Sequence, residues 1–311
     1  MENTTTPKYT FKDRMFDAGL DVVIHNRGLL QKSTFLRRTV INAGKKVSMN
    51  IKPANTLAPI MPPGVKEDQA EFGDAFVHTF EKALERGLSE NTMKCLAHNL
   101  LHGALVSGNS KLARDTFIEQ FHEKPPSTLI IHPGKTCNLR CTGCYSNSGP
   151  AAERLTFETF DRIITEAETK WGIRFAVISG GEPLAYKSDG KDLLDLFEKH
   201  PNTFFMFYTN GTLINEQIAD RLALLGNATP AISIEGWRER TDERRGAGIF
   251  DKILAAFDLL RKKGVIFGIS LTATRYNAEE IFSDEFLDFL FDEQKAYYGW
   301  IFQYMPIGRK F

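Results

Sequence analysis

The sequence predicts an α/β protein, an open partial barrel of six β/α units, (β/α)6, preceded by a helical N-terminal extension. From residue 127 onward, short runs rich in β-branched and aromatic residues alternate with amphipathic stretches of helical period. Parallel neighbouring strands need a long return connection, which a helix normally supplies, so these runs predict a parallel sheet. Eight such units close a full TIM barrel, and six therefore predict an open one.

Composition places the chain among globular proteins. It has 311 residues, of which 42% are hydrophobic and 25% charged, which argues against a disordered, collagenous or disulfide-scaffold protein. No window approaches the roughly 18 uninterrupted apolar residues of a membrane span, and the N-terminus lacks the apolar run of a secretory signal. We therefore expect a cytoplasmic protein. The 39 basic and 39 acidic side chains cancel, so the net charge does not favour nucleic acid as a partner.

Residues 1–124 are predicted to form a helical accessory region, and residues 125–311 the barrel domain. Phe72, Phe76, Phe80 and Leu84 repeat every four residues, as on one face of a helix. Ser89 can cap a helix over 90–108, and a further helix over 111–124 stops at Pro125. The proline-rich segment 50–66 is predicted to be a connector, because proline lacks the amide donor that a helix needs.

Residues 27–52 form a basic segment with seven Lys or Arg and no acid. Apolar residues are interleaved among them, as in a basic amphipathic helix. Three interpretations stay open: a solvated helix packed on the barrel, peripheral contact with an anionic membrane, and contact with an acidic partner.

Each predicted strand is followed by a predicted helix. We expect the six strands at 128–132, 174–179, 203–209, 230–235, 265–273 and 299–307. The helices between them are marked by apolar periodicity around Phe160, Leu194, Leu222, Phe257 and Phe286, with Gly226 and Gly264 as stops. In parallel α/β proteins the loops after the strands form the working face, so polar motifs there are candidate site residues.

Three cysteines follow the first strand at the spacing C-x3-C-x2-C: Cys137, Cys141 and Cys144. Crowded thiols in a cytosolic chain stay reduced and suit a metal better than disulfides. A loop of this spacing can bring three sulfurs to one iron–sulfur cubane and leave the fourth iron open, whereas zinc sites usually show two separated pairs and a fourth ligand. Cys95 lies among apolar residues and is expected to pack in the core, with a radical-relay or extra-ligand role as the alternative.

Polar motifs follow the next strands. The second strand runs into Gly180, Gly181, Glu182 and Pro183, whose paired glycines let the backbone approach a ligand closely. The remaining candidates are Thr209 and Asn210 after the third strand, Ser233 and Glu235 after the fourth, Arg245 in the charged run 237–250, and Thr272 on the fifth strand. Hydroxyls, amides and a guanidinium at strand ends can hold a ribose, an amine or a carboxylate.

Together these motifs resemble those of the radical S-adenosylmethionine (SAM) superfamily, over residues 127–307 and in the same order. The resemblance implies a [4Fe-4S] cluster on Cys137, Cys141 and Cys144, with SAM chelating the fourth iron. Reductive cleavage of SAM then gives a 5′-deoxyadenosyl radical that abstracts hydrogen from a substrate. It implies that Gly180, Gly181, Glu182 and Pro183 hold the SAM amino group. Arg245, with Arg244 as its rival, is implied for the SAM carboxylate.

The resemblance carries over the other contacts and the partners in the same way. Thr209, Asn210, Ser233 and Glu235 are implied as ribose and methionine contacts. Thr272 is a candidate on a different ground: it alternates with Ser270 and Thr274 on one face of the fifth strand, where polar residues inside a barrel should face a ligand. A flavodoxin or ferredoxin is implied as the low-potential electron donor. The charged run is similar to that of SPASM-type, peptide-modifying relatives, so a peptide or protein side chain is the first expected substrate and a lipid or tetrapyrrole the second.

Two features depart from that pattern. Many relatives have an aromatic residue before the third cysteine, where this chain has Gly143 followed by Tyr145. SPASM-type relatives also carry further cysteines after the barrel, and this sequence has none there, which we interpret as a truncated chain or the absence of auxiliary clusters.

The sequence therefore predicts a radical SAM oxidoreductase or transferase. The alternative from another class is a non-catalytic structural module that holds zinc or an iron–sulfur cluster and associates with RNA. Only Lys135 and Arg140 lie as cations in the cysteine loop, which gives RNA binding little electrostatic support.

Overall fold

The computed structural model describes residues 21–22, 24–39, 71, 78–79, 81–96, 99 and 108–309. The chain divides into two compact units, one containing Ser89–Phe311 and the other spanning Ala18–Leu88. The expected connector at 50–66 lies outside the described residues, as do Phe72, Phe76, Phe80 and positions 40–52 of the basic segment. The expected domain boundary after residue 124 stays a prediction.

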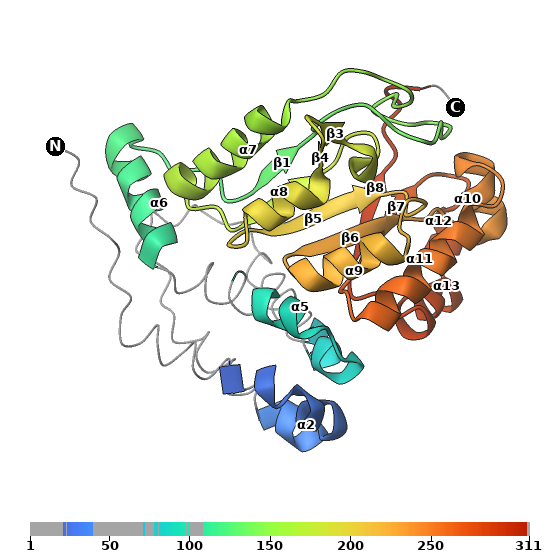
Figure 1. Cartoon of the computed structure of the whole chain (residues 1–311). Helices are drawn as coiled ribbons and strands as arrows, with labels where there is room; N and C mark the ends of the chain where they lie inside the picture. The colour runs from blue at the N-terminus through green and yellow to red at the C-terminus, as the bar shows by residue number, and fades with distance from the viewer. Residues whose placement is uncertain are drawn as a thin grey trace. The chain divides into compact units, whose positions relative to one another are not determined.

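The larger unit is built on one parallel sheet, as predicted (Figure 1). Its strands, in spatial order, are β1 (Leu129–Ile131), β2 (Phe175–Ile178), β5 (Phe204–Thr209), β6 (Ala228–Ser233), β7 (Gly268–Ala273) and β8 (Gly299–Gln303). Every neighbouring pair is parallel, and sequence order equals spatial order. This is the arrangement of a partial TIM barrel, so the predicted fold class is confirmed.

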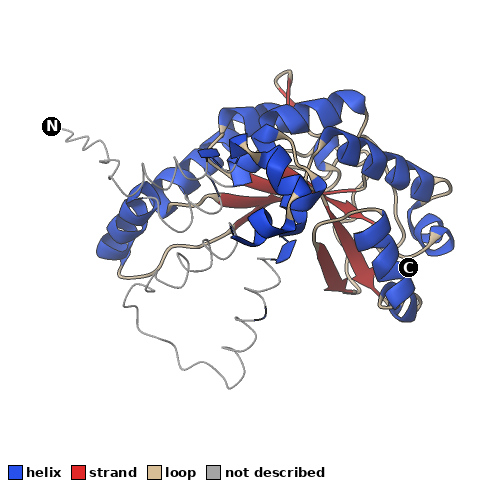
Figure 2. Cartoon of the chain, turned by 90° about the horizontal axis from the view of Figure 1, so that it is seen from below, coloured by secondary structure: helices blue, strands red, loops and turns tan. Residues whose placement is uncertain are grey.

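The helices that return the chain between strands pack on one face of the sheet, while the strands curve beneath them (Figure 2). They are α7 (Phe157–Glu166) with η2 (Ala167–Trp171), α8 (Leu193–Lys199), α9 (Glu216–Leu225), α10 (Arg238–Arg245), α11 (Ile249–Lys263), α12 (Ala278–Ile281), α13 (Asp284–Asp288) and η4 (Phe289–Glu293). Before β1 the same unit contains α5 (Glu90–Cys95) and α6 (Gly108–Phe121).

Local sequence sets the helix ends. The side chains of Thr156, Asp192 and Asn215 accept hydrogen bonds from backbone amides at the starts of α7, α8 and α9. The stops predicted at Gly226 and Gly264 are confirmed, because both glycines take the left-handed conformation, with φ of +70° and +65°.

The main core lies between the sheet and these helices. Phenylalanines dominate it, and Phe160, Phe197, Phe205, Phe207 and Phe257 are fully buried. Alternate residues of the strands point to the other, concave face, where Val177, Met206 and Ala231 pack with Tyr208 and Tyr298. The concave face of a partial barrel is therefore apolar and aromatic near its middle.

The predicted start of the fourth strand was wrong by two residues. The prediction starts this strand at Pro230, but β6 begins at Ala228 and pairs with β5 through Phe207↔Pro230. Proline lacks the N–H that a central strand uses in its hydrogen-bond ladder. Ile234 donates its N–H to Ser270 O on β7. Because backbone N–H groups along a strand point to the same neighbour at every second residue, the nitrogen of Pro230 also points toward β7. Pairing with β7 starts only at Ala231, so the missing N–H costs no ladder bond.

Other boundaries also differ from the prediction. The fifth strand begins at Gly268 and the sixth ends at Gln303, so both are shorter than expected. Helix α6 starts at Gly108, before the expected Lys111. A small hairpin of η3 (Pro183–Ala185), β3 (Lys187–Ser188) and β4 (Lys191–Asp192) was not predicted.

The smaller unit is helical in its described part and includes α2 (Arg27–Lys32). Ile24, Leu30, Ala83 and Leu84 are buried in it. Arg37 of the basic segment is 6% exposed and donates hydrogen bonds to the carbonyls of Leu30 and Gln31, so this cation serves the packing of the unit. Among the residues described, no helix combines the length and apolar character needed to cross a bilayer.

Candidate functional site

The cysteine loop leaves β1 at the carboxyl end of the sheet, as predicted. Cys137, Cys141 and Cys144 are free thiols and are each partly buried. The Cys137 amide donates to Gly149 O at 2.9 Å, which closes the loop at its base. Within 108–309 and the shorter described stretches, no three His, Cys, Asp or Glu side chains converge on one metal-ion position. A cubane binds each thiolate through a different iron, so its ligands need not converge in that way.

The three thiols lie close enough to influence one another. Burial raises the pKa of Cys137, and the negative charges of Glu182, Cys141 and Cys144 add to the rise. Burial also acts to raise the pKa of Cys144, but hydrogen bonds from Ser146 and Ser148 and the charge of Arg309 outweigh it and lower that pKa. Thiolates that repel one another are stabilised as ligands once positive charge enters between them.

The Gly-Gly-Glu-Pro segment after β2 packs directly against the cysteine loop. Gly181 N donates to Gly134 O at 3.0 Å, and Glu182 N donates to Thr136 O at 2.8 Å. A Cβ at Gly181 would lie 2.1 Å from Thr136 O, so only glycine fits there. The structure thus brings this predicted motif beside the residue that precedes Cys137.

The carboxylate of Glu182 is hydrogen-bonded to neighbouring groups of the protein. It accepts hydrogen bonds from Thr209 Oγ1 at 2.7 Å, Asn210 N at 2.8 Å and Leu184 N at 3.1 Å. Complete burial raises the pKa of Glu182. This carboxylate therefore links the end of β2 to the end of β5. One of its three hydrogen bonds uses the hydroxyl proton of Thr209.

Asn210 connects the end of β5 to the cysteine loop. Its Nδ2 donates to Asn138 Oδ1 at 2.9 Å and lies 3.9 Å from the sulfur of Cys137. Asn138 in turn donates to Thr212 Oγ1 at 2.8 Å. Asn138 was not predicted as a site residue, because a lone asparagine beside a cysteine gives no signal in sequence.

Glu235 lies between two arginines after β6. It is 1% exposed, and its carboxylate accepts hydrogen bonds from Arg244 and from Nε and Nη2 of Arg245. Thr272 N donates to Glu235 Oε2 at 3.4 Å. The predicted residues Glu235, Arg245 and Thr272 therefore form one cluster.

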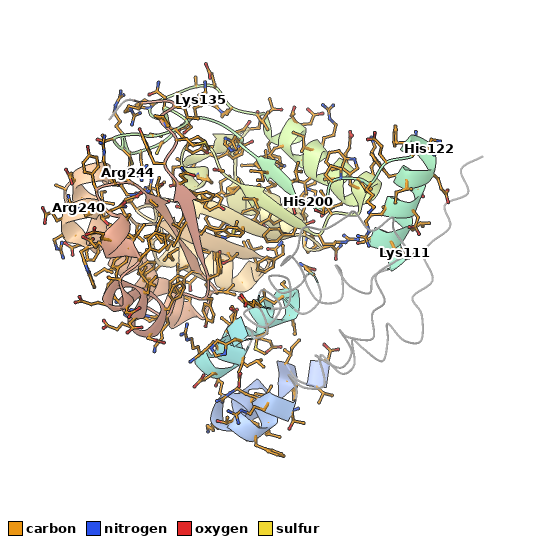
Figure 3. All side chains as sticks on the ribbon, turned by 180° about the vertical axis from the view of Figure 1, so that it is seen from behind. Lys111, His122, Lys135, His200, Arg240 and Arg244 are labelled. Atoms are coloured by element: carbon orange, nitrogen blue, oxygen red, sulfur yellow. The ribbon has the colours of Figure 1, made fainter. Side chains whose placement is uncertain are left out.

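The two arginines have different surroundings. Arg244 Nε donates to Thr142 O in the cysteine loop at 3.2 Å (Arg244 is labelled in Figure 3). Burial acts against the charge of Arg245, but the Glu235 carboxylate and the charges of Cys141 and Cys137 outweigh it and raise the pKa of Arg245. Arg245 therefore lies close enough to Cys141 and Cys137 for their charges to interact. Its Nη1 has no hydrogen-bond partner among the described residues.

Ser233 and Thr272 share the concave face with unused hydroxyls. The register pairs Ser233 with Ser270, two residues before Thr272 on β7. Both side chains are half-buried, and neither hydroxyl has a hydrogen-bond partner in the described part of the chain. Both remain free for a polar ligand.

Gly143 and Tyr145 account for the departure noted in the sequence. Gly143 has φ of +67°, in the left-handed region that favours glycine over an aromatic residue. The Tyr145 hydroxyl lies 3.1 Å from Ser179 Oγ at the end of β2, and its ring meets His132 edge-on. The aromatic side chain therefore reaches the strand ends from the far side of Cys144.

Cys95 lies away from this site. Its thiol donates to Leu225 O at 3.4 Å, at the end of α9 and thus at the amino ends of the strands. Burial raises its pKa to about 11, so it is held as a thiol.

The site fits the cofactors that the sequence suggested. The carboxyl ends of the strands carry four kinds of group. They are the three free thiols of the cysteine loop, Gly181 packed against that loop, the Arg245 nitrogen that has no partner among the described residues, and the hydroxyls of Ser233 and Thr272. Soft thiolates suit iron–sulfur clusters, and the other groups suit a carboxylate and a ribose.

Comparison with known proteins agrees with this geometry. Residues 131–284 match the family model of the radical SAM superfamily. The mycofactocin maturase MftC of Mycolicibacterium smegmatis is 33% identical over 174 residues, which cover 54% of this chain and 43% of that protein. The Fe-coproporphyrin III synthase of Methanosarcina barkeri is 26% identical over 182 residues, covering 57% of this chain and 45% of that protein.

The fold is also seen in a solved structure. SuiB of Streptococcus suis, crystallised with the precursor peptide SuiA, superposes with a TM-score of 0.53 at 20% identity, covering 61% of this chain and 42% of that one. The chain therefore spans less than half the length of these relatives. Radical SAM proteins use a [4Fe-4S] cluster and SAM. By its matched motifs and its partial barrel, the part of the chain over residues 131–284 is a radical SAM domain.

Proposed function

We propose that this protein cleaves SAM reductively and uses the product to abstract a hydrogen atom from a substrate. The observation that carries the proposal is the contact of the cysteine loop with the Gly180–Pro183 segment, through Gly181 N and Glu182 N. Cys137, Cys141 and Cys144 would hold the cluster. When bound, the cluster and SAM supply a 5′-deoxyadenosyl radical.

The residues with free groups are the proposed SAM contacts. Arg245 keeps Nη1 unpaired beside the cysteines, and a guanidinium binds a carboxylate well. Ser233 and Thr272 offer hydroxyls on the concave face for the ribose or the methionine part. Arg244 is less suited, because it is already bonded to Thr142 O and Glu235.

Glu182, Thr209, Asn210 and Glu235 are proposed to act mainly as supports. Their polar groups are engaged with neighbouring loops, so they hold the Gly180–Pro183 segment, the end of β5 and Arg245 in place. Rigid support of this kind keeps reacting groups aligned. The backbone of Gly180, Gly181 and Pro183 stays available for the SAM amino group.

We propose a peptide or protein side chain as the substrate, with a flavodoxin or ferredoxin as electron donor. MftC is named a maturase, and SuiB was crystallised with a precursor peptide, which supports this class. The concave face offers the rings of Tyr208 and Phe302, which lie 5.5 Å apart and suit an apolar side chain. A tetrapyrrole is the second candidate, because Fe-coproporphyrin III synthase is also similar to this chain.

One anaerobic assay tests the proposal. The protein is reconstituted with iron and sulfide, reduced with dithionite and incubated with SAM, and 5′-deoxyadenosine is measured by chromatography. We expect formation of the nucleoside by the wild type and none by Cys141→Ala, with Cys95→Ala as the matched control that keeps activity. Zinc in place of iron, or equal product from Cys141→Ala, would overturn the assignment.

A further inference from the structure

The segment after β8 folds back onto the cysteine loop and binds it through one residue, Arg309. Arg309 Nη1 donates to Cys141 O at 2.7 Å, its Nη2 donates to Ser148 O, and its backbone N donates to Cys144 O at 2.8 Å. Two of these carbonyls belong to proposed cluster ligands. A residue more than 160 positions away in sequence therefore holds both ends of the Cys141–Ser148 stretch.

Gly308 makes this approach achievable. Its φ is +80°, and a Cβ there would lie 2.2 Å from Tyr145 O and 2.3 Å from Cys144 O. Any other residue would both strain the backbone and push the segment off the loop. The chain is thus built so that Arg309 reaches its three carbonyls.

No carboxylate of the described residues neutralises the charge of Arg309. Its hydrogen-bond acceptors are all backbone carbonyls, and it takes part in none of the ion pairs between described residues. By contrast, Arg244 and Arg245, which also lie near the loop, both face Glu235. A half-buried, uncompensated positive charge therefore lies against the backbone of Cys141 and Cys144.

We propose that Arg309 is a positioning residue that fastens the cysteine loop and that its charge makes the bound cluster easier to reduce. This inference rests on the proposed function, because it assumes a cluster on Cys137, Cys141 and Cys144. Reduction adds one negative charge to the cluster, which a nearby cation stabilises. Hydrogen bonding and charge around the ligands are established ways in which proteins tune cluster potentials.

The fastening is tested first without any cluster. Hydrogen exchange is measured in cluster-free protein at the amides of Cys137, Thr142 and Asn147, which are bonded to Gly149 O, Arg244 O and Cys144 O. In Arg309→Met these amides should exchange roughly tenfold faster, because the loop opens locally more often. Arg309→Lys should also exchange faster, since lysine lacks the rigid two-nitrogen fork with which the guanidinium reaches Cys141 O and Ser148 O. Arg162→Met, at an exposed position on α7, is the matched control and should exchange as the wild type does.

The charge effect is tested on reconstituted protein by redox titration followed by electron paramagnetic resonance. Arg309→Met should shift the reduction equilibrium about tenfold against the reduced cluster, which is a midpoint about 59 mV more negative for one electron. Arg309→Lys keeps the charge and should titrate close to the wild type, as should Arg162→Met.

The outcomes separate this inference from the proposed function. If the wild type assembles no cluster, the proposed function fails, whatever the exchange data show. If it assembles one and Arg309→Met matches it in both exchange and midpoint, the inference about Arg309 is wrong and the proposed function stands. If the midpoint potential of Arg309→Lys became as negative as that of Arg309→Met, the charge argument would be overturned.

Discussion

Glu235 shows how a residue predicted from sequence acquires its physical role only in the structure. Its position at a strand end suggested a ligand contact, which stays a prediction, and the fold makes it the shared partner of Arg244 and Arg245. The sequence contains the charged run, but a run of charges does not tell which of its members turn inward. Burial decides this, and burial is a property of the assembled fold.

Glu235→Gln should destabilise the protein by about 3 kcal/mol, because it leaves two arginines, 13% and 12% exposed, without a counter-charge. The free energy of unfolding is measured by urea denaturation of the cluster-free protein. Asp251→Asn is the matched control, because it breaks an exposed ion pair in which Arg238 and Asp251 are 54% and 61% exposed. It should lower the free energy of unfolding by less than about 1 kcal/mol. Equal effects of the two substitutions would contradict the account.

His200 forms a second buried charge cluster, at the other end of the strands from Arg244 (Figure 3). Its ring nitrogens lie 3.0 Å from Asp161 Oδ1 and 3.2 Å from Glu168 Oε2. His200→Gln should cost about 2 kcal/mol, because a neutral amide replaces the partner of two partly buried carboxylates. Lys170→Gln, which removes an exposed i,i+4 pair with Glu166, should cost less than about 0.5 kcal/mol.

The same cluster predicts an acid-side loss of stability. Burial acts to raise the pKa of Asp161, but hydrogen bonds and charges from Lys199 and His200 lower it from its ordinary 3.8. Burial likewise acts to raise the pKa of Glu168, but hydrogen bonds from His200 and Thr203 and the charges of His200 and Arg174 lower it from its ordinary 4.5. Carboxyl groups with lowered pKa contribute stability that is present above their unfolded pKa and is lost as the pH falls through the folded pKa. Urea midpoints from pH 6 down to pH 3 should therefore fall less steeply in His200→Gln than in the wild type.

At the scale of elements, periodicity predicted the six strands and the main helices, and it failed where periodicity is absent. Helix α10 buries only Thr241, so its sequence shows no apolar periodicity and looks like a solvated run of charges. The strands of the β3–β4 hairpin are two residues each, too short for any alternation to show. Strand β6 was shifted because the tolerance of Pro230 depends on where β7 begins, which no local pattern contains.

The contact between β2 and the cysteine loop is tested by Gly181→Ala. The added methyl group would lie 2.1 Å from Thr136 O, so the loop that carries Cys137 must move. We expect SAM binding to weaken by more than about tenfold, or ~1.4 kcal/mol, as measured by equilibrium dialysis of the reconstituted protein. Gly28→Ala, where a Cβ meets nothing within 4 Å, is the control. Unchanged binding in Gly181→Ala would show that the two segments move independently.

At the scale of the whole molecule, the fold class and the order of the motifs could be predicted because both depend on local patterns repeated along the chain. The partners of these motifs could not, since they come from distant segments. Asn138 meets Asn210, Thr142 meets Arg244, and Cys141 meets Arg309 only when the sheet curves and brings the strand ends together. The sequence therefore predicts the motifs that the fold brings together better than it predicts the residues that hold them in place.

The central claim is that three cysteines bind a [4Fe-4S] cluster and leave one iron free for SAM. Electron paramagnetic resonance of the reconstituted, reduced protein tests it most directly, with SAM labelled by 17O in the carboxylate and 15N in the amino group. The account predicts a reduced-cluster spectrum that changes when SAM is added and acquires hyperfine coupling to both labels. A cluster spectrum that labelled SAM leaves unchanged, or no cluster spectrum at all, would contradict it.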